Sequence, residues 1–349
     1  MRTFSALRQA WLTGITIGLC GCLLWGGAVR AEDDLAVADE EEEFPSIHLR
    51  LGHTSALNHS HNKAAEQFAR EVREKTGGRV IIDIFPNFEL GDQESLVEQV
   101  NLGGVDMCIA THGNTGTFVP RLNALTAPYL FNDYAHSHRV IDNFLLRWEN
   151  EALEEFNLHA LAIFDYGFRH LTTKGKAIYD VNDLKGMVIR VPNYRGLKLG
   201  LEEMGAETKS VAYFYLYQAL ASGTVTAQDN PLDTILSDGL YAVQDHLSLT
   251  FHYLDTQNLL INYDLYSSFS RKLQKVLTDA ATNAMMLTRE LIANRDELTL
   301  SELQRKGFKV NDVRRSSFKA RLHKTYEELA KASSEENMAQ LQEAVRRFE

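Results

Sequence analysis

Alternating apolar and polar positions mark the start of the folded chain. Residues 47–52 alternate as expected of a half-buried strand, and apolar residues from Ala64 to Val72 recur at the spacing of an amphipathic helix. The polar run Asn58-His59-Ser60-His61 precedes that helix and offers side chains that can cap it. Residues 79–85 form a second strand pattern. The chain therefore opens with a β-α-β unit, whose two strands we expect to be parallel in one sheet.

The same alternation of strand and helix patterns continues along the chain, which predicts an α/β fold. Further strands are predicted at residues 105–110, 158–166, 188–191, 224–228 and 259–262. Helices are predicted at residues 93–102, 136–156, 195–204, 213–221, 231–241, 267–305 and 316–348. In α/β sheets, ligands are held by the loops that follow strand ends, and the late helices are long enough to brace two lobes.

The first residues have the order of an export signal. Arg2 and Arg8 give a basic start, residues 10–24 are apolar, and Val29-Arg30-Ala31 ends the segment with small residues. We interpret residues 1–31 as a signal peptide and expect a periplasmic protein. The run Leu19-Cys20-Gly21-Cys22 weakly resembles a lipoprotein acylation site, so anchoring at Cys22 is the alternative.

Charge and cysteine content narrow the functional class. Residues 32–46 are acidic and lack periodicity, so we expect a disordered leader there. Loss of Arg2, Arg8 and Arg30 takes the formal charge from -11 to -14. An acidic chain argues against nucleic acid as a partner, and any anionic ligand must be held by local positive groups. If cleavage follows Ala31, Cys108 is the only cysteine left, which excludes an intramolecular disulfide. Its apolar setting predicts an inert thiol.

Common catalytic and metal-binding motifs do not occur in the sequence. It contains no H-E-x-x-H, paired C-x-x-C or G-x-S-x-G pattern, and Gly103-Gly104 lacks the continuation of a phosphate loop. A metal site at His53, His59 and His61 is conceivable, but polar histidines are common near helix starts. We therefore predict a binding protein with no metal, no cofactor and no catalysed reaction.

A buried arginine gives the first indication of a binding site. Arg190 lies in an apolar, β-branched run, where a guanidinium is seldom left without a carboxylate or phosphate partner. That partner is either a ligand or an internal salt bridge, and this pattern alone does not decide between them. Nearby, Tyr213 is a candidate to line a cleft and Tyr217 to pack in the core. Asn230 before Pro231 fits a helix cap as the simplest alternative to a ligand contact.

Several segments in this order are similar to one transporter family. From residue 47 to the C-terminus the chain resembles the extracytoplasmic solute-binding subunits of tripartite ATP-independent periplasmic (TRAP) transporters, of the DctP type. The most specific match is Asp183-Leu184-Lys185-Gly186 followed by Ile189-Arg190-Val191-Pro192. Further matching segments are Ala64-Ala65-Glu66-Gln67-Phe68-Ala69, Glu74-Lys75-Thr76-Gly77-Gly78-Arg79-Val80, Phe85-Pro86-Asn87 with Leu90-Gly91, and Ala127-Pro128-Tyr129-Leu130-Phe131.

The resemblance implies a periplasmic binding protein fold in which two α/β lobes, joined by crossing segments, close on a ligand. Lobe I would comprise residues 47–166 and about 256–295, and lobe II residues 167–255 and about 296–349. Energy for transport would come from an ion gradient, and the partners would be TRAP membrane permease subunits.

The family pattern also implies roles for individual residues. Arg190 matches the arginine that grips a ligand carboxylate, Arg169 the second basic contact, and Asn230 the asparagine that completes the polar clamp. Asp229 and His252 match positions that could supply an orienting shell around them. Four lobe I residues fall at positions that could face the ligand, without being family signatures: His53, Thr111, His112 and Asn114.

The chain departs from the family pattern at one motif in particular. Tyr213-Phe214-Tyr215-Leu216-Tyr217 stands where the family usually has Phe-Ser-Glu-Leu-Tyr. This change puts the transfer of any one substrate in doubt, and a C4-dicarboxylate, a sugar acid or another monocarboxylate would each satisfy a central arginine. Two other functions stay open: a receptor that presents its ligand to a sensor, and a secreted enzyme acting on organic acids.

Overall fold

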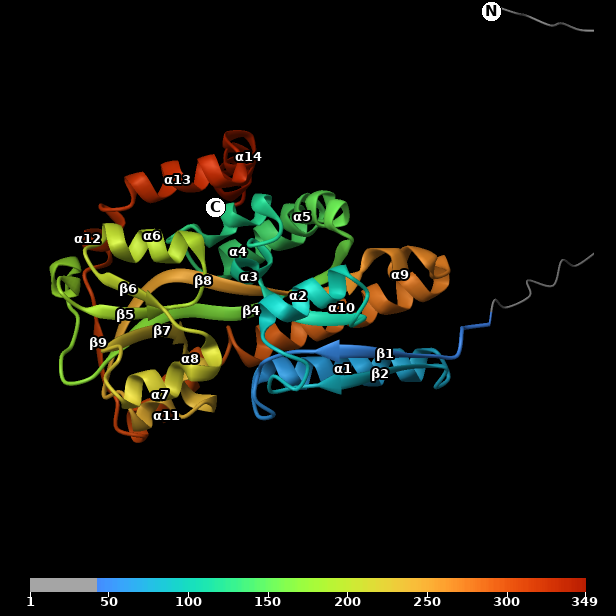
Figure 1. Cartoon of the computed structure of the whole chain (residues 1–349), viewed down its shortest axis with the longest axis horizontal. Helices are drawn as coiled ribbons and strands as arrows, with labels where there is room; N and C mark the ends of the chain where they lie inside the picture. The colour runs from blue at the N-terminus through green and yellow to red at the C-terminus, as the bar shows by residue number, and fades with distance from the viewer. Residues whose placement is uncertain (1–42) are drawn as a thin grey trace, which may run out of the picture. The chain divides into compact units, whose positions relative to one another are not determined.

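One mixed β-sheet runs through the computed structural model, which describes residues 43–349. The strand order is β2-β1-β3-β8-β4-β7-β5-β6, with β9 pairing along β8 (Figure 1). The strands are β1 (Ile47–Gly52), β2 (Val80–Phe85), β3 (Met107–Thr111), β4 (Leu158–Thr173), β5 (Val188–Val191), β6 (Glu207–Ser210), β7 (Ala227–Pro231), β8 (His246–Asn262) and β9 (Lys309–Asp312). We call β1, β2 and β3 with their helices the β1 half, and β5, β6 and β7 with theirs the β5 half.

The two long strands β4 and β8 are antiparallel and connect both halves. At one end β8 pairs with β3, and at the other end β4 pairs with β7. Their mutual register shifts sharply in between, because Arg169 lies opposite Tyr253 whereas Leu171 lies opposite Ser248. The additional β8 residues bulge out there, and Phe251 adopts a positive φ of 48°. Both halves therefore share one sheet, in which the pairing of β4 with β8 shifts register at three places, with the largest shift at Arg169 and Leu171.

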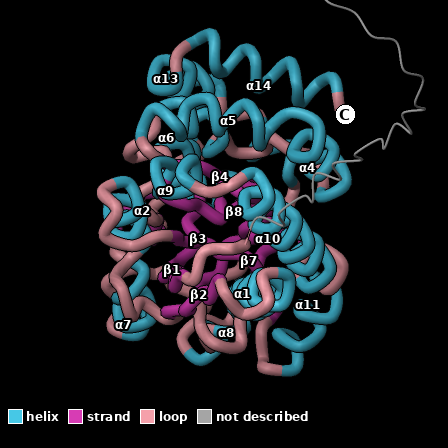
Figure 2. Tube along the Cα trace, turned by 90° about the vertical axis from the view of Figure 1, so that its right-hand side faces the viewer, coloured by secondary structure: helices cyan, strands magenta, loops and turns pink. Residues whose placement is uncertain are grey.

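Helices surround the strands, which lie in the interior of Figure 2. The helices are α1 (Ser60–Lys75), α2 (Gln93–Asn101), α3 (His112–Thr115), α4 (Tyr134–Val140), α5 (Leu146–Leu153), α6 (Arg195–Glu203), α7 (Leu216–Ala221), α8 (Leu232–Ser237), α9 (Tyr263–Ser268), α10 (Arg271–Leu291), α11 (Asp296–Arg305), α12 (Arg315–Lys319), α13 (His323–Ser333) and α14 (Glu335–Arg347). Apolar side chains of α1 and α10 pack on β1 and β2 in one core cluster, and those of α7, α8 and α11 pack beside β7 and β8 in another. Because both faces are covered, β4 and β8 are buried along almost their whole length.

The α/β class and the opening β-α-β unit are confirmed, with β1 parallel to β2. The predicted end of a strand at Tyr166 is wrong, because β4 continues through Gly167 to Thr173. The predicted helix at residues 231–241 also differs: Pro231 is the N-cap of α8, which ends at Ser237. Strands β6 and β9 were not predicted. Tyr217 is 45 % exposed, so its predicted place in the core is wrong.

The predicted signal peptide, the alternative acylation site at Cys22 and most of the acidic leader lie outside the described residues. Within residues 43–349, no helix combines the length and apolarity that crossing a membrane requires. Cys108 is fully buried, and burial raises the pKa of its thiol, which agrees with the predicted inert cysteine.

Candidate functional site

A cavity of about 250 Å³ lies between the β1 half and the β5 half. From the β1 half its lining includes Thr54, Ser55, His59, Phe88, Gln93 and Asn114. From the β5 half and β4 it includes Tyr166, Arg169, Arg190, Tyr194, Tyr213 and Asn230. Many of these residues lie at or just beyond the carboxyl ends of parallel strands, where α/β sheets hold their ligands. Its size suits a small solute, since cavities for drug-sized ligands range from about 300 to 1,000 Å³.

Arg190, in β5, is a buried cation without a carboxylate partner among the described residues. Its side chain is 1 % exposed, and Nε donates to the carbonyl oxygen of Val211 at 2.9 Å. Its guanidinium carbon lies 5.6 Å from the centre of the Tyr213 ring. Burial and then the nearby charge of Arg169 lower the pKa of Arg190. The alternative of an internal salt bridge is therefore not what this structure shows, and donors of Arg190 are left for a bound group.

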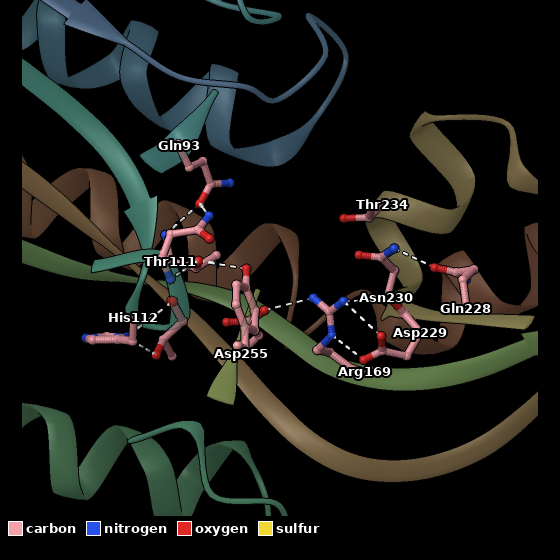
Figure 3. A network of polar contacts seen from close by, with 12 residues as sticks. Gln93, Thr111, His112, Arg169, Gln228, Asp229, Asn230, Thr234 and Asp255 are labelled. Carbon is pink, nitrogen blue, oxygen red and sulfur yellow. Dashed lines mark hydrogen bonds and ion pairs between the residues drawn. The ribbon is translucent and has the colours of Figure 1, made fainter. Parts of the chain in front are cut away.

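Arg169, in β4, is equally buried but fully compensated. Its Nε donates to Asp229 Oδ2 at 2.6 Å and its Nη1 to Asp255 Oδ2 at 2.9 Å, as Figure 3 shows. Burial opposes the charged form, but Asp229 and Asp255 raise the pKa of Arg169 well above its usual value. These bonds fix the plane of the guanidinium at the edge of the cavity.

The two carboxylates beside Arg169 respond differently to their burial. Burial raises the pKa of Asp255 to about 6 in spite of the arginine. Burial would also raise the pKa of Asp229, but Arg169 and His252 together bring it below its usual value. His252 Nε2 lies 3.3 Å from Asp229 Oδ2, so Asp229 and His252 both stand behind Arg169 rather than on the cavity wall.

Asn230 lines the cavity near the end of β7. Its Nδ2 donates to Gln228 Oε1 at 2.5 Å (Figure 3). Gln228 Nε2 in turn donates to Thr172 Oγ1 at 2.7 Å. The alternative in which Asn230 caps a helix is wrong, because the N-cap of α8 is Pro231. Hydrogen bonds through Gln228 to Thr172 hold the amide group of Asn230 in place, and its Oδ1 is left to accept from another donor.

Tyr213 lines the cavity, as predicted for a cleft residue, and connects several of its features. Its hydroxyl donates to a carboxylate oxygen of Asp238, which also lines the cavity. Burial and the charge of Asp238 raise the pKa of Tyr213 well above its usual value, so the phenol stays protonated. Phe88 of the β1 half stacks on Tyr213 with ring centres 6.0 Å apart.

Of the four lobe I candidates, Asn114 lines the cavity, whereas His53, Thr111 and His112 do not. Thr111 Oγ1 lies 2.7 Å from the hydroxyl of Tyr194 and so supports a cavity residue from behind. His112 is buried away from the cavity with Nε2 2.7 Å from Glu149 Oε2, and burial raises the pKa of Glu149. His53 is buried close to His59, and burial followed by the charge of His59 lowers its pKa to about 4.

Contacts across the cavity join the two halves. Ser60 N donates to Asp233 Oδ2 at 3.1 Å, and His59 Nε2 lies 3.5 Å from the same oxygen. Gly113 of the β1 half packs on Tyr194, where a Cβ would come within 2.3 Å of the ring. A side chain at Gly113 would therefore separate the halves.

Several cavity residues carry no local sequence signal. Tyr194 is the N-cap residue of α6 and Asp238 the C-cap residue of α8, and His59 was noticed only as a capping and metal-binding candidate. Gln93 accepts from Thr111 N at 2.9 Å and from Asn114 Nδ2 at 2.8 Å, which orients its amide toward the cavity (Figure 3). No local pattern marks a helix-start glutamine as a site residue.

Comparisons with known proteins agree with one another. Residues 51–333 match the family described as bacterial extracellular solute-binding protein, family 7, or DctP. A solute-binding protein of Verminephrobacter eiseniae is 32% identical over 269 residues, which cover 76% of this chain and 79% of that protein.

Solved structures give the same result. A TRAP periplasmic solute-binding protein of a Polaromonas species, bound to D-erythronate, is 30% identical with a TM-score of 0.80, covering 84% of this chain and 98% of that one. A TRAP periplasmic solute-binding protein of Chromohalobacter salexigens, with bound D-glucuronate, is 28% identical with a TM-score of 0.81, covering 85% and 99%. Both neighbours are TRAP periplasmic solute-binding proteins, and at this similarity they share the α/β fold of this chain.

Proposed function

Because the chain belongs to the DctP family of TRAP extracytoplasmic solute-binding proteins, we propose that it captures a small organic acid outside the cytoplasm and delivers it to TRAP membrane subunits. The related structures hold D-erythronate and D-glucuronate, which are both carboxylates. The cavity between the halves is where we place the ligand of this chain.

The observation that carries this proposal is the unpaired guanidinium of Arg190. A planar guanidinium can bind a carboxylate through two parallel, charge-assisted hydrogen bonds, which fix its orientation as well as its charge. Without such a partner, a buried cation is costly. We therefore assign the ligand carboxylate to Arg190, a second contact to Arg169, and a hydroxyl or carbonyl contact to Asn230.

Closure of the two halves on the ligand is the mechanism that fits this site. The lining comes from both halves, so a bound solute contacts both and has its highest affinity for the closed arrangement. A smaller register shift between β4 and β8, at Asp165 and Gly167, lies between the stretches that pair with β3 and with β7. A change of backbone angles there would move one half relative to the other.

The first prediction is that Arg190→Ala weakens binding of D-glucuronate or D-erythronate by at least about 2 kcal/mol, which is about 30-fold, because the ligand carboxylate loses its charge-assisted bonds. Arg190→Lys should recover only part of the loss, since an ammonium lacks the planar fork. Isothermal titration calorimetry measures both effects.

The matched control is Arg147→Ala, which removes an exposed arginine of α5 and should leave affinity unchanged. Circular dichroism establishes that each variant is folded. If folded Arg190→Ala binds as the unaltered protein does, the carboxylate is held elsewhere. If no organic acid binds to the unaltered protein, the proposed solute class is wrong.

A further inference from the structure

Charges around the cavity are unequally matched. Arg169 and Arg190 are the two arginines of the lining, and the carboxylates of Asp92, Glu94 and Asp238 line the same cavity. Arg169 is already neutralised by Asp229 and Asp255. One cation therefore remains for a ligand, and beyond it the surroundings are negative. A ligand carboxylate placed at Arg190 is favoured, whereas a second one would meet like charge.

Asp238 is held in place at this cavity. Its Oδ2 accepts from the Tyr213 hydroxyl and its Oδ1 from Ser237 Oγ at 3.0 Å. A carboxylate can accept about four hydrogen bonds, so acceptor positions are left over for donors in the cavity. The Tyr213 ring also lies beside Arg190, so Tyr213 contacts Arg190 with its ring and Asp238 with its hydroxyl. The length of one tyrosine side chain therefore separates Asp238 from the proposed carboxylate site.

The hydroxyl that fixes Asp238 belongs to Tyr213, which stands where the family usually has phenylalanine. Neutral polar groups complete the surroundings. Tyr166, Thr234 and Asn230 line the cavity with hydroxyl and amide groups. Such groups, together with an acceptor carboxylate, suit a ligand that carries several hydroxyls.

We infer that the Tyr213–Asp238 pair selects a singly charged, polyhydroxylated acid, an aldonic or uronic acid, and rejects dicarboxylates. The pair accepts hydrogen bonds from ligand hydroxyls and repels a second carboxylate. This inference rests on the proposed function and makes Asp238 a specificity-determining residue of the same site.

The test compares two acids of equal length that differ at one end. D-Galactonate ends in a hydroxymethyl group where galactarate has a second carboxylate, and calorimetry with each gives a ratio of dissociation constants. We expect the unaltered protein to bind galactonate at least about tenfold more tightly than galactarate. Asp238→Asn should reduce that ratio to about threefold or less, because it removes the repulsion but keeps the shape.

Two further variants make the result specific. Tyr213→Phe keeps the ring beside Arg190 but removes the hydrogen bond to Asp238. It should therefore lower the affinity for galactonate, while galactarate, still repelled by the charge of Asp238, should continue to bind more weakly than galactonate. Asp279→Asn removes one charge from the exposed surface of α10 and should leave the ratio unchanged. Thermal melts establish folding, and Tyr213→Phe gives an independent reading if Asp238→Asn is unstable.

Tighter binding of galactarate than of galactonate would overturn the inference while leaving the proposed function intact. So would a ratio that Asp238→Asn does not change. Absence of binding to both acids, and to D-glucuronate and D-erythronate, would instead remove the proposed function on which the inference rests.

Discussion

Arg169 and Arg190 show that equal burial can serve different purposes. Both side chains are 1 % exposed, but Arg169 lies between two carboxylates and Arg190 has a single backbone acceptor. An arginine with internal counter-charges stabilises the fold, whereas one without them is costly until a ligand arrives. Folding and binding are therefore divided between two residues of the same type in one cavity.

We predict that Arg169→Met lowers the free energy of unfolding by about 3 to 5 kcal/mol, because Asp229 and Asp255 would be left buried without their cation. Arg190→Met, which removes an equal side chain that lacks a carboxylate partner, should cost clearly less. Urea denaturation of the ligand-free proteins measures both. Equal losses would show that the ion pairs of Arg169 contribute nothing particular to stability.

Residues with a strong local context were the ones that sequence reasoning could find. Arg190 lies in an apolar run, whereas the family pattern pointed to Arg169 and Asn230. The structure places all three at the cavity. Asp238 and Tyr194 escaped notice because residues at helix ends are commonly polar whatever their role. Tyr217 was misplaced because an aromatic at helical spacing is usually buried, whereas α7 is short and its outer face is open.

At the scale of elements, strand and helix types were more predictable than their ends. β5 begins and ends where predicted, since Val188–Val191 is a short apolar run between polar turns. β4 and β8 were predicted at about half their length or less, because polar residues such as Arg169 and Asp255 interrupt the apolar pattern. Those polar residues are buried by their mutual ion pair, a long-range arrangement that no local window can detect.

The contact between the α1 start and α8 leads to a prediction about closure. Asp233→Ala removes the acceptor of Ser60 N and the partner of His59, and Asp233 does not line the cavity. Since one charge-assisted bond of the closed arrangement is lost, we expect affinity to fall about fivefold. Calorimetry measures it, and small-angle scattering should show a larger mean radius without ligand.

Asp264→Ala is the matched control, because Asp264 also stands in the first turn of a helix, α9, within the β1 half. It removes a carboxylate that favours a helix start but forms no part of the cavity lining. Equal losses of affinity in both variants would attribute the effect to helix stability rather than to closure.

For the whole molecule, buried titratable groups couple stability to pH. Burial is the leading cause that lowers the pKa values of His53, His61 and His170, that of His53 to about 4. In the unfolded chain these histidines take up protons below about pH 6.5, whereas in the folded protein they stay neutral to lower pH. Their contribution to the free energy of unfolding is therefore complete above about pH 6.5 and is lost as the pH falls toward 4. Asp255 and Asp296 act in the opposite direction, since burial raises their pKa values to about 6 and 7.

With three histidines against two carboxyl groups, we predict that the thermal midpoint falls between pH 6.5 and pH 4. His53→Gln should make the fall shallower, and its stability relative to the unaltered protein should rise by up to about 3 kcal/mol at pH 4. His48→Gln, on the exposed side of β1, is the control. Parallel melting profiles for His53→Gln and the unaltered protein would contradict the assignment.

The acidic side chains around the cavity also bear on how quickly a solute is captured. Asp92 and Glu94 line the same cavity as Arg190, and the whole chain carries a formal charge of -11. An approaching anion is repelled until it is close to the guanidinium, and dissolved ions weaken that repulsion over about 10 Å at 0.1 M ionic strength. Association should therefore accelerate as salt rises, while residence time is governed by contacts inside. An anionic solute would therefore associate with this protein faster at high salt concentration than at low salt concentration. That dependence is the reverse of electrostatic steering, in which salt slows association.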